Sequence, residues 1–183
     1  MTALQYALVA YVRDPVGGFV EDLRHQLLPE HGHLPAHITV LPPRLLQCSE
    51  EIAIEALRRV IAPAQSFEVE MGEVENFLPT TPTVFLRVSR AAYRLRELHD
   101  ELNLGCLYCP EQWTYMPHMT VVKMPDLDLA VAAMETAREQ WSAYRGPRSV
   151  VIDRLSFVRE AQGQRWLDLA EVRLTSPVAA LPR

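Results

Sequence analysis

The stretch PHMTVVKM, residues 117–124, sets two polar side chains inside a run that otherwise has the composition of a buried strand. Successive side chains of a β-strand point to opposite faces, so His118 and Thr120 share one face while Met119 and Val121 occupy the other. The second face is apolar and suits a protein core, whereas the first carries an imidazole and a hydroxyl. The pattern therefore predicts a strand with one core face and one functional face.

An earlier stretch, PAHITVLPP at residues 35–43, repeats this arrangement. Here His37 and Thr39 share one face, and Ile38 and Val40 take the apolar face. Chance alone produces two such pairs among six histidines in about one shuffled sequence in ten, so the motif is weak by itself. Its weight comes from context, because both stretches closely follow a proline and occupy the same place in a repeated order of elements.

That order is strand, helix, His-x-Thr strand, helix, strand, twice over. Alternating or continuous apolar runs predict the strands, and apolar residues at helical spacing predict the helices. The expected strands of the flanking segments are residues 4–12, 67–71, 83–88, 150–158 and 166–174, with Gly163 in the turn between the last two. The expected helices carry the stripes 19–27, 53–61, 91–102 and 130–141, with Ser49 and either Asp126 or Asp128 as N-caps. The seam between the halves is expected at residues 80–82.

Bulk composition excludes several classes of protein. The chain has 183 residues, of which 49% are hydrophobic, enough for one domain or two small, tightly packed lobes. A net charge of −5 argues against binding long nucleic acid along an extended basic face, but leaves a nucleotide or a nucleic-acid end as a partner. The apolar run of residues 4–12 is too short to span a bilayer and lacks a signal peptide's flanks. We therefore expect a soluble, cytoplasmic protein with no membrane partner.

The cysteines predict neither a disulfide nor a metal site. Cys48, Cys106 and Cys109 are odd in number and accompany no secretion signal, which indicates reduced thiols. Cys106 and Cys109 form a C-x-x-C pair, yet no second pair follows at the spacing that a zinc site needs. We expect no metal and no cofactor.

Two histidines and two hydroxyls on converging strands suit cleavage of a cyclic phosphodiester. In-line opening needs a base on one side of phosphorus and an acid on the other, and histidine serves in either role near neutral pH. Thr39 and Thr120 can donate to the non-bridging oxygens as charge gathers there. Lys123 adds a cation, but strict alternation places it on the face opposite His118 unless the strand ends or bulges at Val122.

These residues resemble the 2H phosphoesterase superfamily, which includes 2′-5′ RNA ligase and cyclic phosphodiesterase proteins. The resemblance rests on the tetrads HITV and HMTV, the basic residue that ends the second strand, and a closing strand-turn-strand with a tryptophan, RLSFVREAQGQRWLDL. It implies one bilobal α+β domain over residues 1–183, with pseudo-symmetric halves of about 1–80 and 81–183. Each lobe is expected to have an antiparallel-rich sheet and flanking helices, with a central cleft between the lobes.

The resemblance also implies an activity. It is metal-independent cleavage of a 2′,3′-cyclic or 2′-5′ phosphodiester at a nucleotide or RNA terminus, with His37 and His118 as acid and base in either assignment. Thr39, Thr120 and Lys123 then bind the phosphate, Lys123 standing where many members have arginine. Residues 41–43, LPP, replace the aromatic-containing continuation of the ligase branch, which leaves ligation, hydrolysis and the substrate open.

Other interpretations stand beside this one. The fold could serve as a nucleotide or RNA-end binding module without turnover, or His31 and His33 could join the cysteines in a zinc hydrolase. The two tetrad histidines could instead be core residues bonded to backbone. Tyr115 and Trp166 could stack a base or simply pack at the rim. His25 and His99 are expected on solvent-facing helix surfaces, and we expect a monomer.

Overall fold

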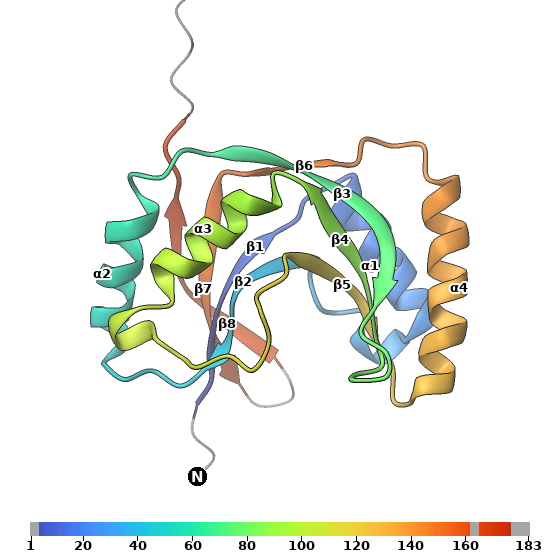
Figure 1. The fold of residues 1–183 in the computed structure, drawn as a ribbon, viewed down its shortest axis with the longest axis horizontal. Coiled ribbons are helices and arrows are strands. Elements are labelled where there is room, and N and C mark those ends of the chain that lie inside the picture. The colour runs from blue at the N-terminus through green and yellow to red at the C-terminus, as the bar shows by residue number, and fades with distance from the viewer. Residues whose placement is uncertain (1–3, 162–164, 177–183) are drawn as a thin grey trace, which may run out of the picture.

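A computed structural model describes residues 4–161 and 165–176, and the turn predicted at Gly163 lies outside these residues. Along the chain, the elements are β1 (Tyr6–Tyr11), α1 (Val16–Leu27), β2 (His37–Arg44), α2 (Glu50–Ile61), β3 (Phe67–Asn76), β4 (Thr83–Arg90), α3 (Ala92–Leu102), β5 (His118–Lys123), α4 (Leu127–Ala143), β6 (Ser149–Ile152), β7 (Arg154–Ala161) and β8 (Arg165–Arg173). The order strand, helix, strand, helix, strand therefore occurs twice before β7 and β8, as the sequence predicts (Figure 1).

All eight strands join one curled sheet in the order β6-β3-β4-β5-β2-β1-β7-β8. Every pairing within it is antiparallel. The two His-x-Thr strands, β2 and β5, are neighbours at its centre, so the two halves of the chain meet there. The predicted α+β class, with related halves and flanking helices, is confirmed, and the sheets of the two halves form one continuous sheet.

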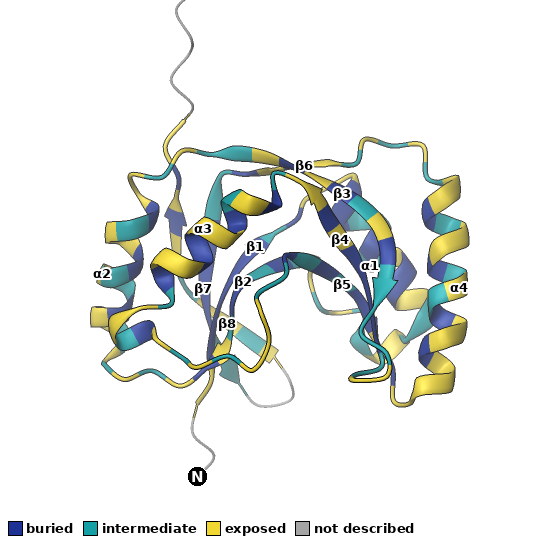
Figure 2. Ribbon diagram, in the orientation of Figure 1, coloured by how far each residue is buried: buried dark blue, intermediate teal, exposed yellow. Residues whose placement is uncertain are grey.

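The four helices pack against one face of this sheet and cross between the halves. Helix α1 of the first half packs on β5, and α3 of the second half packs on β2. Helix α4 covers β3, β4 and β5, whereas α2 packs against α3 and β8. In Figure 2 each helix is buried along one side and exposed along the other. The core includes the fully buried side chains of Leu8, Leu23, Ile38, Leu57, Leu86, Leu95, Met119 and Trp141. The opposite face of the sheet is free of helices and carries the polar residues of β2 and β5.

Local sequence explains where two helices begin. The Ser49 side chain accepts the backbone N–H of Ile52 at the start of α2, and the Asp126 carboxylate accepts that of Leu129 at the start of α4. These bonds satisfy backbone donors that have no partner within the helix. Ser49 is thus confirmed as a cap, and of the two aspartates considered for α4 it is Asp126 that serves.

The single strand predicted over residues 150–158 is wrong. The chain forms two strands there, β6 and β7, separated at Asp153 and placed on opposite halves of the sheet. β6 pairs with β3, whereas β7 pairs with β1 and β8. A continuous apolar run indicates extended backbone but not which strands pair with it, so the pattern does not reveal the break at Asp153.

The sheet curls toward its helix-free face until its two ends approach each other. A cavity of about 390 Å³ is lined by Tyr11 of β1, Val151 of β6 and Glu171 of β8, strands that lie far apart in the sheet order. Backbone hydrogen bonds also join Thr175 to Ala64 and Ser66, on either side of Gln65. Within the described part of the chain, no helix combines the length and apolar character needed to cross a membrane.

Candidate active site

The register of the central strands brings both histidines and both threonines onto the helix-free face. Ile38 of β2 lies opposite Met119 of β5, so one step along the antiparallel pair sets His37 opposite Thr120 and Thr39 opposite His118. With the outer neighbours included, one row across the sheet runs through Tyr11, His37, Thr120 and Phe85. The next row runs through Val9, Thr39, His118 and Arg87. The four candidate residues therefore form a compact square in which each histidine faces a threonine.

The buried partners of these residues point the other way. Ile38, Val40, Met119 and Val121 are fully buried in the core, whereas the four site residues are each half-buried. In such a register, diagonal neighbours such as His37 and His118 have Cα atoms roughly 7–8 Å apart. That spacing leaves room for a small group between the two rings.

Both imidazoles make the same backbone contact. Nδ1 of His37 lies 2.8 Å from the carbonyl oxygen of Pro35, and Nδ1 of His118 lies 2.7 Å from that of Met116. Because a carbonyl oxygen only accepts, each Nδ1 carries a hydrogen and donates it. In the neutral ring, Nε2 then holds the free lone pair. The fold thus fixes one tautomer on both histidines and leaves each Nε2 available to a ligand.

Burial disfavours the charged form of both rings. It lowers the pKa of His37 below its usual value, an effect opposed by the Pro35 hydrogen bond and reinforced by the positive charges of Arg24 and a protonated His118. Burial likewise lowers the pKa of His118, opposed by the Met116 hydrogen bond. Each histidine can therefore be neutral, as a base requires, at mildly acid pH.

The surroundings of the two histidines differ. The ring of His118 lies against two aromatic rings, with centroids 5.1 Å from Phe77 and 5.0 Å from Phe85. The ring of His37 meets only the edge of Tyr11, at 6.5 Å, among the aromatic contacts of the described residues. The Tyr11 hydroxyl donates to Asp168 at 2.8 Å, and burial, together with this contact, raises the pKa of the tyrosine. The pseudo-symmetric pair is thus chemically unequal.

A bulge in β5 determines where Lys123 points. Phe85 pairs with Thr120 and Val84 with Val122, so β5 holds one extra residue, Val121, between these pairs. Lys123 then lies opposite Thr83, two residues from Phe85 on the same face of β4. The bulge, one residue before the position considered from the sequence, returns the exposed Lys123 to the face of His118 and Thr120. It is the only lysine of the chain.

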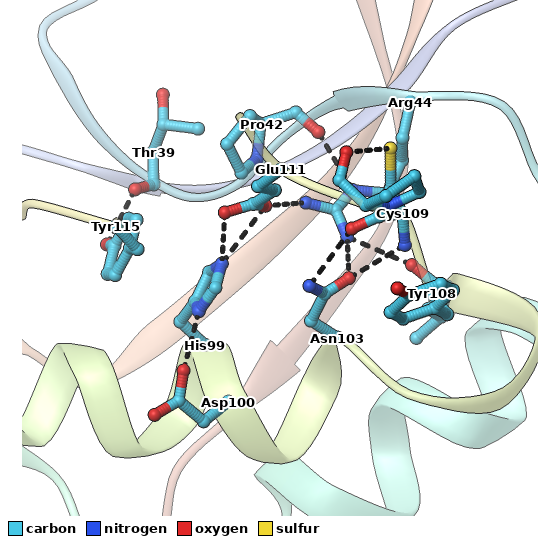
Figure 3. A network of polar contacts seen from close by, with 12 residues as sticks. Thr39, Pro42, Arg44, His99, Asp100, Asn103, Tyr108, Cys109, Glu111 and Tyr115 are labelled. Carbon is cyan, nitrogen blue, oxygen red and sulfur yellow. Dashed lines mark hydrogen bonds and ion pairs between the residues drawn. The ribbon is translucent and has the colours of Figure 1, made fainter. Parts of the chain in front are cut away.

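Tyr115 reaches the site through its hydroxyl. That group donates to the carbonyl oxygen of Thr39 at 2.8 Å, and one face of its ring is stacked on His99, with centroids 4.2 Å apart and planes 5° apart (Figure 3). Only the other face of the Tyr115 ring can therefore stack on a base, and that role stays a prediction. Trp166 is half-buried against Ala7, Val9 and Val158 on the helix-free face, and its stacking role also stays a prediction.

The solvent-facing position predicted for His99 is wrong, whereas His25 is exposed. His99 is only 5% exposed, and its ring nitrogens lie 3.0 Å from Asp100 and 3.1 Å from Glu111 (Figure 3). Glu111 also pairs with the buried guanidinium of Arg44 at 2.8 Å. A sign of this burial was present in the sequence, since His99 follows Leu95 by four residues on the buried stripe of α3. Its partners could not be predicted, because Tyr115, stacked on the ring, and Glu111, bonded to a ring nitrogen, both come from a loop.

Arg24 was also missed. Its guanidinium is buried on α1 and donates to backbone carbonyls before β2 and within β5. A signal was present in the sequence, since Arg24 follows Val20 by four residues on the buried stripe of that helix. Among residues 4–161 and 165–176, no group of three or more histidine, cysteine or acidic side chains is placed to hold a metal ion. His33 instead bonds to the backbone of Glu30.

A sequence model of the 2′-5′ RNA ligase superfamily matches residues 12–164. The chain belongs to this superfamily. The resemblance seen in the two tetrads is therefore confirmed at the level of the family. Curated relatives named "Putative phosphoesterase" come from Halalkalibacterium halodurans, 23% identical over 64% of this chain and 69% of the relative, and Oceanobacillus iheyensis, 22% identical over 89% and 94%.

Solved structures match over nearly the whole chain. LigT from E. coli in its apo form has a TM-score of 0.58 and 14% identity, covering 93% of this chain and 97% of that one. LigT complexed with 3′-AMP has a TM-score of 0.55 and 16% identity, covering 94% and 98%. TT0787 from Thermus thermophilus has a TM-score of 0.62 and 15% identity, covering 92% and 97%. At these identities the likeness establishes the shared fold alone.

Proposed function

We propose that this protein is a metal-independent phosphodiesterase that opens a 2′,3′-cyclic or 2′-5′ phosphodiester at a nucleotide or RNA end. The observation that carries the proposal is the square of residues on the helix-free face, in which His37 lies opposite Thr120 and His118 opposite Thr39. Membership of the 2′-5′ RNA ligase superfamily supports a phosphoester substrate. The complex of LigT with 3′-AMP supports a nucleotide in particular.

The reaction needs one neutral and one protonated histidine. The neutral ring accepts a proton from the attacking water at Nε2, and the protonated ring donates its Nε2 proton to the departing ribose oxygen. Fixing Nδ1 on backbone carbonyls directs both transfers to Nε2. The two threonine hydroxyls donate to the non-bridging oxygens, where negative charge gathers in the transition state. Lys123 adds a positive charge on the same face.

The cavity beside Tyr11 offers a place for the nucleoside portion. Its volume of about 390 Å³ is lined by polar and charged side chains, including Arg13, Ser149 and Asp153. Tyr11 lines this cavity and its ring centroid lies 6.5 Å from that of His37, so one side chain connects the cavity with the histidines. Polar walls of this kind suit hydrogen bonding to a ribose and base better than an apolar ligand.

Hydrolysis of a nucleoside 2′,3′-cyclic phosphate in EDTA tests the proposal. We expect turnover by the wild-type protein and its loss in His37→Gln and His118→Gln, each by about 100-fold or more, because general acid–base catalysis contributes about 10²–10⁴-fold. His25→Gln, on an exposed helix position, is the matched control. Nucleotide binding without turnover by the wild type would instead favour a binding module, and inhibition by EDTA would favour a metal-dependent hydrolase.

The same assay run across pH tests the acid–base pair. The singly protonated pair is most abundant between the two apparent pKa values, which burial holds below the usual histidine value of about 6.5. We expect kcat/KM to be bell-shaped with its maximum below about pH 6.5, since this parameter reports the free enzyme. A profile that rises steadily into alkaline pH would contradict paired-histidine catalysis.

A further inference from the structure

The two halves of the sheet meet where β2 pairs with β5. Two side chains add hydrogen bonds to the backbone at the two ends of this short pairing. β2 and β5 pair in register at Ile38 and Met119. We use the term β2–β5 seam for the backbone segments around this pair, residues 34–39 and 115–121. Buried backbone carbonyls that are not hydrogen-bonded to a neighbouring strand need other donors. At the β2–β5 seam these donors are side chains, Arg24 at one end and Tyr115 at the other.

Arg24 holds the end of the β2–β5 seam that contains His37. Its Nε donates to the carbonyl oxygen of Val121 at 2.8 Å, one terminal nitrogen donates to that of Thr120 at 2.7 Å, and the other donates to that of Leu34. The residue is only 4% exposed. A planar guanidinium presents its donors in a rigid fork, so three acceptors on two segments fix those segments relative to each other.

A second side chain of α1 acts on the same segment. One turn before Arg24, the Glu21 carboxylate accepts the backbone N–H of Ala36 at 2.7 Å. Leu34 and Ala36 precede His37 by three residues and one residue, and Thr120 lies opposite it. Side chains of helix α1 thus bond to the segment that precedes His37 and to the bulged part of β5, which turns Lys123 to the face of His118.

Tyr115 holds the other end of the β2–β5 seam. Its hydroxyl donates to the carbonyl oxygen of Thr39, which lies opposite His118. The stacked His99 ring and the Glu111 carboxylate behind it keep Tyr115 in place (Figure 3). A loop residue that precedes His118 in the chain is therefore tied to the strand of the other histidine.

We propose that Arg24 and Tyr115 are positioning residues that clamp the two ends of the β2–β5 seam and so hold the His37 and His118 rings at one fixed separation. The kinetic part of this proposal rests on the phosphodiesterase function proposed above. Its structural and electrostatic parts do not, because they concern the free protein.

The two clamps differ in charge, and this difference affects the two histidines unequally. Arg24 places a buried positive charge behind His37, whereas Tyr115 brings a neutral hydroxyl to the other end. The titratable and charged groups around the His37 ring are Arg24 from α1, His118 from β5 and Tyr11 from β1. The positive charge of Arg24 reinforces the effect of burial in lowering the pKa of His37. Only the pKa of His37 carries this contribution, so we expect Arg24 to oppose protonation of His37 more than that of His118.

NMR titration of the imidazoles in the free protein tests the charge. The variants His37→Gln and His118→Gln show which imidazole signal belongs to which histidine. Arg59→Gln, at an exposed position of α2, is the control. In Arg24→Gln we expect the pKa of His37 to rise and that of His118 to change less, because a nearby positive charge is lost. In Arg24→Lys the charge stays, and we expect the His37 pKa to stay near the wild-type value.

Kinetics test the positioning. In Arg24→Lys and Tyr115→Phe we expect kcat to fall by about tenfold or more with a smaller change in KM, since misplacing catalytic groups by 1 Å costs about 10²-fold in rate. Tyr93→Phe, at an exposed position of α3, is the control for Tyr115→Phe. Tyr115→Phe removes one hydroxyl and keeps the stacked ring, so it remains informative even where an Arg24 variant fails to fold.

Two results would overturn the proposal: wild-type kcat in folded Tyr115→Phe and Arg24→Lys, or equal movement of the two histidine pKa values in Arg24→Gln. A wild-type protein without phosphodiesterase activity would overturn the proposed function instead, and the titration would still decide the electrostatic role of Arg24.

Discussion

At the scale of single residues, the site depends on contacts that a strand pattern predicts only in part. Alternation along β2 and β5 places each histidine on the same face as its threonine, and this much follows from two residues of spacing. The hydrogen bonds from His37 and His118 to carbonyls two residues upstream come from the chain's path before each strand. Since this path depends on tertiary packing, the tautomers could not be predicted from the sequence.

The threonine hydroxyls provide a test at this scale. Thr39→Val and Thr120→Val keep the branched shape and the strand, and remove one donor each. We expect kcat/KM for a nucleoside cyclic phosphate to fall by about 10–100-fold per variant, because a hydrogen bond to a charged group contributes about 1.5–3 kcal/mol. Thr136→Val on α4 is the control. Unchanged kcat/KM in both site variants would show that the hydroxyls do not contact the phosphate.

At the scale of elements, the sequence predicted the order well and the partners poorly. Periodicity detects a strand or helix because it depends on neighbours within a few residues. It does not report that β6 and β7 separate at Asp153, or that the loop residue Glu111 bonds to the ring of His99. The sequence predicts that Lys123 shares a face with His118 only if the strand ends or bulges at Val122, and the bulge lies one residue earlier, at Val121. Such a register shift becomes visible only when β4 is paired with β5.

The bulge makes Lys123 a chemical probe of the site. Because it is the only lysine, an amine-reactive reagent labels just this side chain and the N-terminal amine. We expect inorganic phosphate or a nucleoside cyclic phosphate to slow labelling of Lys123, measured by peptide mass spectrometry, while the N-terminal amine reacts at an unchanged rate. Lys123→Gln should raise KM more than it lowers kcat, and Lys123→Arg should restore it. Labelling that ignores both ligands would remove Lys123 from the phosphate site.

At the scale of the whole molecule, the helix-free face joins the two halves and carries the polar residues that the helices leave uncovered. The repeated order of elements in the sequence predicts related halves, yet it does not predict that α1 crosses to β5 and α3 to β2. This crossing is what lets Arg24, from the first half, hold a strand of the second. The exchange arises from packing between distant segments, which local sequence patterns do not contain.

The free energy of unfolding is expected to depend on pH through the two histidines of this face. Both histidine pKa values lie lower in the folded protein than the usual value of about 6.5, so the unfolded chain binds more protons between the two. Stability contributed by the neutral rings is therefore present above about pH 6.5 and decreases as the pH falls toward the folded pKa values. We expect the free energy of unfolding in urea to decline over this interval in the wild type and to decline less in the double variant His37→Gln, His118→Gln. Parallel pH profiles for the two proteins would show that these imidazoles are no harder to protonate in the fold than in the unfolded chain, and would contradict the lowered pKa values that burial gives both rings.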